Sequence, residues 1–246
     1  MNAYYMRNRG GNMVLSSLHA SKAENLGEEA GFTVFASSAL SPEDEDDVFR
    51  SLLSDARIVL IRWIREKRYI PRLFASAFLF ILAYFFLSVV ISDPIPIIDE
   101  IVLSFLAAAL LWIALTRLDE KSALMKERYK AVAGAIMSAS FLVSGDMKII
   151  EAYYDSLYSL SLLETAEMIV NGDCCLPSSL TEGWKDDFTF SLLLHLKASD
   201  SGIEKTLRRI ENERDKERTA RFLVHQVTVG SLDILDLALY IALKNS

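Results

Sequence analysis

The chain has 246 residues, of which 52% are hydrophobic, and its 33 acidic and 26 basic side chains leave a formal net charge of -7. This length predicts one or two domains, and the hydrophobic content is typical of a chain that is partly embedded in a membrane. The acidic balance, without interleaved aromatic and basic residues, argues against nucleic acid as a partner.

Residues 1–40 predict a flexible N-terminal tail. Glycine and serine are frequent there and no hydrophobic period is sustained, which is typical of segments that bury too little apolar surface to fold alone. The short apolar patch at residues 32–35 leaves open a strand or a segment that docks on a partner.

Residues 41–70 predict an amphipathic basic helix. Ser41 is a suitable N-cap, Pro42 suits the first helical position, and the acidic run at residues 43–47 lies at the positive end of the helix dipole. Five consecutive acidic residues point around the whole helix, so they do not predict a divalent-cation site. The apolar stripe beyond them favours equally an in-plane helix on the cytoplasmic leaflet and packing on the C-terminal domain. Pro71 predicts a break after this helix.

Residues 71–118 predict a transmembrane helical hairpin. Its spans, about residues 73–92 and 98–117, carry long uncharged runs; at ~1.5 Å per residue, about twenty residues match a hydrocarbon core of roughly 30 Å. Pro94 and Pro96, between the spans, favour a tight turn. The alternatives are a re-entrant or interfacial segment and a fully buried helix of a large soluble core, and the rest of the chain has little material to cover both runs in such a core.

The charges beside the spans predict the orientation of the hairpin. Basic residues precede the first span and follow the second, whereas the connecting segment carries only Asp93, Asp99 and Glu100. Because basic flanks tend to remain in the cytoplasm, both termini are predicted to be cytoplasmic, in a protein that crosses the inner membrane twice.

Residues 119–246 predict a cytoplasmic helical domain. The apolar stretch at residues 131–143 is too short to cross a bilayer and favours a core helix, with a re-entrant or subunit-packing segment as the alternative. Further helices are expected over residues 146–170, closed by Gly172, over 185–198, over 201–229, and from a Ser231 cap to Lys244. The fold class is therefore all-α: an amphipathic helix, a membrane hairpin and a helical bundle.

The sequence predicts no catalytic, cofactor-binding or metal site, and hence no enzyme activity. Cys174 and Cys175 are adjacent, a spacing that favours reduced thiols over a disulfide or a zinc site. Acidic pairs at helical spacing have no histidine three positions on, and no phosphate loop or nucleophile motif occurs. The weaker candidates for such chemistry are His195, His225, Glu151, Asp155, Glu164 and Glu167.

The predicted function is a two-span inner-membrane protein whose helical domain is an interaction or scaffolding module. Its expected partners are the lipid bilayer and either another protein or a second copy of the chain, through the cytoplasmic helices. The alternative is an oligomeric pore or membrane-perturbing effector gated by that domain. The lack of charged residues inside the spans disfavours an ion-coupled carrier.

Overall fold

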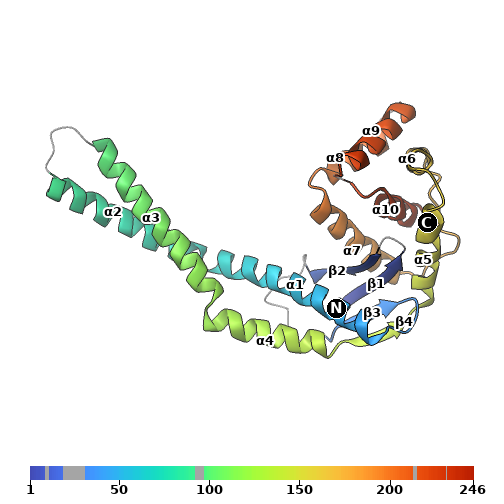
Figure 1. Cartoon of the computed structure of the whole chain (residues 1–246), viewed down its shortest axis with the longest axis horizontal. Helices are drawn as coiled ribbons and strands as arrows, with labels where there is room; N and C mark the ends of the chain where they lie inside the picture. The colour runs from blue at the N-terminus through green and yellow to red at the C-terminus, as the bar shows by residue number, and fades with distance from the viewer. Residues whose placement is uncertain (9–10, 19–30, 92–96, 213–214, 231) are drawn as a thin grey trace. The chain divides into compact units, whose positions relative to one another are not determined.

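The computed structural model describes residues 1–8, 11–18, 31–91, 97–212, 215–230 and 232–246 (Figure 1). The chain divides into two compact units. Unit 1 is built from the described parts of Met1–Ser21, Glu29–Asp55 and Ala135–Ser246, and unit 2 consists mainly of Ala56–Gly134. The fold is mostly helical and contains two strongly apolar helices, as the sequence predicts, but it also contains a small mixed sheet.

The sheet corrects two expectations, the all-α class and the flexible tail at residues 1–40. Its strands are β1 (Asn2–Asn8), β2 (Gly11–Ser16), β3 (Thr33–Ala36) and β4 (Ser140–Val143), in the order β2-β1-β3-β4. β1 pairs antiparallel with β2 and parallel with β3, and β3 pairs parallel with β4. The patch at residues 32–35 thus supplies most of a central strand. Expectations for residues 19–30 lie outside the described residues.

Helices α5 (Gly145–Leu157) and α7 (Trp184–Ser199) pack against the sheet, and α10 (Ile234–Asn245) packs against both of them (Figure 1). Tyr4 lies in the core between sheet and helices, with its ring centroid 5.0 Å from that of Phe188 in α7. Helices α6 (Leu162–Asn171), α8 (Ile203–Asn212) and α9 (Lys216–Thr228) complete this layer. Unit 1 is therefore an α/β unit and not a purely helical bundle.

Helix α1 (Pro42–Lys67) begins in unit 1 at the predicted cap and continues into unit 2. The Ser41 Oγ accepts a hydrogen bond from the Asp44 amide at 3.2 Å, and the Asp44 carboxylate accepts one from the Ser41 amide at 3.2 Å. Asp44 also accepts hydrogen bonds from Tyr5 and Arg7 of β1, each at 2.6 Å. These bonds, that of Tyr5 first, hold the pKa of Asp44 well below its usual range. Asp44 of the acidic run therefore links α1 to β1 by hydrogen bonds, and the run also lies at the positive end of the helix dipole.

Unit 2 contains the antiparallel pair α2 (Tyr69–Ile91) and α3 (Ile97–Glu120), and most of α4 (Ala123–Met137). α1 ends at Lys67, so the predicted break falls just before Pro71, which lies in the first turn of α2. α4 ends at Met137, which corrects the expectation of one helix over residues 131–143, because the stretch continues as β4.

Two other expected helices are each divided. The 146–170 segment is interrupted where Ser161 caps α6 with a capping box, although Gly172 closes that helix with φ 80°, as predicted. The 201–229 segment restarts at Asp215, whose side chain accepts a hydrogen bond from the Arg218 amide at 3.0 Å. Asp233 caps α10, and Ser231, the predicted cap, lies outside the described residues.

Candidate functional site

A cleft of about 560 Å³ opens in unit 1 between the sheet edge and the surrounding helices. Its walls come from β2, from the unit 1 part of α1, from α5 and α7, and from the start of α10. This volume lies within the range of small-molecule sites, which are typically roughly 300–1,000 Å³. All lining residues belong to unit 1.

Three polar side chains, Tyr154, Asp236 and His195, contact one another in the wall of this cleft. Asp236, at only 3% exposure, accepts a hydrogen bond from the Tyr154 hydroxyl at 2.9 Å. Its other carboxylate oxygen lies 3.5 Å from Nε2 of His195, an α7 side chain that remains 37% exposed. Because a buried carboxylate is stable only when its oxygens are satisfied, Tyr154 and His195 hold Asp236 in place.

Contacts among these three side chains, together with burial, shift the pKa values of His195 and Tyr154. The contact between His195 and Asp236 raises the pKa of His195, whereas burial of the imidazole lowers it. Burial, followed by the charge of Asp236, raises the pKa of the Tyr154 hydroxyl, which therefore stays a hydrogen-bond donor. Of the three side chains, the imidazole of His195 is the one whose ordinary pKa lies nearest to neutral pH.

Asp233 adds a further carboxylate at the start of α10. One of its oxygens caps the helix, accepting hydrogen bonds from the amides of Leu235 at 2.9 Å and Asp236 at 3.3 Å. Desolvation within the cleft, and then the charge of Asp236, raise the pKa of Asp233 even though its side chain reaches solvent. Asp55 of α1 lines the same cleft and accepts a hydrogen bond from Ser16 at 3.4 Å.

The cleft also has an aromatic wall on α5. The rings of Tyr154 and Tyr158 lie 5.8 Å apart at an interplanar angle of 64°. Among the described lining residues, three are aspartates and none is lysine or arginine. The cleft thus has an acidic lining with aromatic residues beside it, and among the described lining residues His195 is the one whose side chain can carry positive charge.

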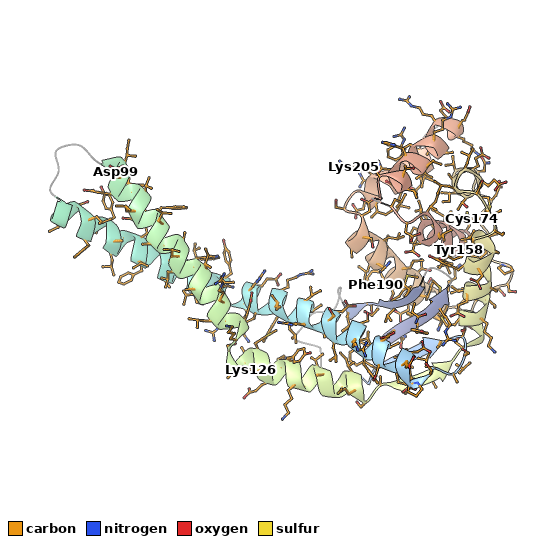
Figure 2. The ribbon with its side chains drawn as sticks, in the orientation of Figure 1. Asp99, Lys126, Tyr158, Cys174, Phe190 and Lys205 are labelled. Atoms are coloured by element: carbon orange, nitrogen blue, oxygen red, sulfur yellow. The ribbon has the colours of Figure 1, made fainter. Side chains whose placement is uncertain are left out.

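In the hairpin of unit 2 the apolar side chains lie on the outside, whereas in a soluble protein they lie in the core. Within the described part of the chain, two helices are long and apolar enough to span a membrane. Only 11% of the apolar window in Tyr69–Val89, and 6% of that in Ile98–Met137, is buried. Phe74, Val89 and Phe105 are 71%, 76% and 65% exposed, and Figure 2 shows side chains projecting outward along both helices.

Polar groups instead lie between the two helices of the hairpin. At one end the Ser88 hydroxyl donates to Glu100 at 2.6 Å. At the other, Arg72 is 4% exposed, donates to Thr116 at 2.8 Å and to the carbonyl of Arg65, and lies 3.4 Å from Asp119. Its guanidinium also sits 5.4 Å from the centroid of the Trp112 ring.

The other side chains considered from the sequence do not converge. Cys174 is buried, Cys175 is exposed, and both thiols are free. Glu151 accepts a hydrogen bond from the Arg7 amide at 2.8 Å, and Glu164 belongs to the Ser161 capping box. Among the described residues no group of three histidine, cysteine or acidic side chains is arranged to hold a metal ion.

Of the residues in the cleft network, His195 is the one that stands out in the sequence as a candidate. Asp233 and Asp236, three residues apart at a helix start, were the available signal for the rest of the network. No family model, curated protein or solved structure matches this chain.

Proposed function

We propose that this protein is a two-span inner-membrane protein that holds a compact α/β interaction unit on the cytoplasmic side. The observation that carries the proposal is the distribution of side chains in the hairpin, apolar outside and polar between the helices. A soluble protein would expose this much phenylalanine, leucine and isoleucine to water at a large cost, whereas lipid is a good solvent for it.

The construction of unit 1 supports the same-side placement of the two chain ends. Its sheet pairs β1 and β3, which precede the hairpin, with β4, which follows it. A chain that crosses a bilayer between β3 and β4 must cross it an even number of times for these strands to pair. Two crossings by α2 and α3 satisfy this requirement, and the basic flanks favour the cytoplasm for unit 1.

Cysteine labelling tests the topology. In a background with Cys174→Ala and Cys175→Ser, single cysteines replace Asp99, at the start of α3, or Lys126, in α4, both exposed side chains (Figure 2). In intact cells whose outer barrier has been opened, a membrane-impermeant maleimide should label D99C and spare K126C until the inner membrane is permeabilised. Equal labelling of the two cysteines before permeabilisation, or protein that remains in the supernatant when membranes are pelleted, would refute the proposal.

The interaction role is tested through unit 1. Cross-linking in membranes followed by purification in mild detergent should recover a defined complex or a dimer through unit 1 residues. Release of a dye trapped in sealed liposomes containing the purified protein would instead favour the pore-forming alternative. The buried position of Ser76 and Ser104 argues against that alternative, because these hydroxyls do not form an outward polar face that could line a channel.

A further inference from the structure

A basic pocket of about 460 Å³ lies at the end of the hairpin where α2 begins and α3 ends. Every residue that lines it belongs to unit 2. Three of them are arginines, Arg65, Arg72 and Arg117, and the one carboxylate among the described lining residues is Glu120. The pocket offers surface to a ligand, because the side chain of Arg65 is 57% exposed and Arg117 is exposed as well. It is therefore an accessible site with an excess of positive charge.

The fold already uses two of these three cations. Arg72 is buried among its partners within the hairpin, and Arg65 donates to Glu120 at 2.6 Å. Arg117, by contrast, makes no hydrogen bond or ion pair with any residue in the described part of the chain. Asp119 and Glu120, the acidic residues that follow it in the sequence, are each paired with another arginine. The guanidinium of Arg117 is therefore available to an anion from outside the chain.

Aromatic and apolar side chains form the rest of the pocket. The rings of Tyr69 and Trp112 lie 5.5 Å apart at an interplanar angle of 81°, and Tyr69 is 51% exposed. Ile113 lines the same pocket at 50% exposure, and one helical turn further into the hairpin Leu73 and Leu110 are 48% and 66% exposed. Tyrosine and tryptophan are enriched at the level of lipid headgroups, between water and hydrocarbon. The pocket thus joins cationic side chains to the apolar outer surface of the hairpin.

We propose that this pocket binds the headgroup of an anionic phospholipid, with Arg117 and Arg65 facing the phosphate and the acyl chains lying along the exposed apolar side chains of α2 and α3. Basic pockets beside transmembrane helices on the cytoplasmic side suit such headgroups, and arginine pairs with phosphate through two parallel hydrogen bonds. A soluble phosphate would meet the cations but leave the apolar surface unused. The inference rests on the membrane topology proposed above, which brings lipid headgroups to this end of the hairpin.

Native mass spectrometry of the full-length protein in mild detergent tests the site with three probes. Phosphatidylglycerol is anionic, phosphatidylcholine with the same acyl chains is zwitterionic, and glycerol 3-phosphate carries a phosphate without acyl chains. Phosphatidylglycerol should bind at least roughly tenfold more tightly than phosphatidylcholine, and an excess of glycerol 3-phosphate should not displace it. Equal affinities for the two lipids would overturn the proposal. Displacement by glycerol 3-phosphate would also overturn it, in favour of a soluble phosphate, and so would a lipid-free dimer that Arg117→Gln abolishes, in favour of a second copy of the chain.

Matched variants locate the site. Arg117→Gln removes the charge of the unpaired cation, and Arg57→Gln makes the same change at an exposed side chain of α1 that does not line the pocket. R117Q should weaken phosphatidylglycerol binding roughly fivefold, R65Q/R117Q should bring its affinity to within about twofold of that for phosphatidylcholine, and R117K should retain most of it. R57Q should leave the preference unchanged. An equal loss in R57Q, which would indicate a general attraction of the basic flank, or an unchanged preference in the double variant would contradict the assignment.

Membrane sedimentation separates a failure of the site from a failure of the topology. Protein that pellets with membranes and yet binds the two lipids equally would refute the lipid site alone. Protein that stays in the supernatant without detergent would refute the two-span topology and, with it, this site.

Discussion

Replacing Tyr154 with phenylalanine isolates one hydrogen bond of the cleft network. The change removes a hydroxyl that donates to Asp236 at 2.9 Å and leaves a carboxylate of 3% exposure with one partner fewer. Hydrogen bonds to charged groups contribute about 1.5–3 kcal/mol each. For a domain of this size about 1 kcal/mol corresponds to roughly 2–4 °C, so we expect Y154F to lower the unfolding temperature by about 3–12 °C.

Tyr158 provides the matched control, because it lies one helical turn further along the chain and its hydroxyl makes no hydrogen bond within the described part of the molecule. Y158F should shift the unfolding temperature by less than about 1 °C. The measurement is thermal unfolding of unit 1 in the full-length protein, followed by near-ultraviolet circular dichroism. Hydrogen exchange should also quicken in the first turn of α10, where Asp236 lies. Equal shifts for the two variants would refute the reasoning about Asp236.

Three further predictions concern other contacts. Because the contact with Asp236 raises the pKa of His195, the protonated imidazole stabilises the fold. This stabilisation is complete below pH ~6.5 and is lost as pH rises through the folded-state pKa. In urea titrations at several pH values, H195Q should therefore flatten that part of the plot of unfolding free energy against pH, relative to H225Q. Ser161→Ala should cost about 1 kcal/mol through loss of the capping box, seen as faster hydrogen exchange in α6. Arg72→Met should cost about 1.5–3 kcal/mol, because it removes the hydrogen bond that the buried guanidinium donates to Thr116, whereas the exposed Arg68→Met should change little. The assay is thermal unfolding in detergent, and equal effects of the two variants would contradict it.

The features that could be predicted from the sequence depend on neighbours along the chain. The two apolar helices can be predicted because each forms its backbone hydrogen bonds within its own segment. The helix ends at Ser41 and Gly172 can be predicted because a cap acts within one helical turn. The divided helices could have been anticipated in part, because Ser161 and Asp215 are good N-caps inside segments that otherwise look continuous.

The sheet and the cleft depend on partners that are distant in the sequence. β3 pairs with β4 through Val34 opposite Phe141, across the whole of α1, α2, α3 and α4. β1 also lacks the alternation of a surface strand, because Tyr4 and Tyr5 are both buried, one against the helical core and one beside Asp44 of α1. A short strand covered on both faces has no periodic signal, and its neighbours cannot be read from local sequence.

The hairpin lies within the connection between two adjacent parallel strands of the sheet. The connection between two adjacent parallel strands is long by necessity, and in soluble α/β proteins it holds a helix that packs on the sheet. Here the connection from β3 to β4 contains α1, the hairpin and α4. The sheet forms only when both ends of that connection return to unit 1. In the proposed topology strand pairing therefore requires an even number of crossings, because a single crossing would leave β4 without its partner β3.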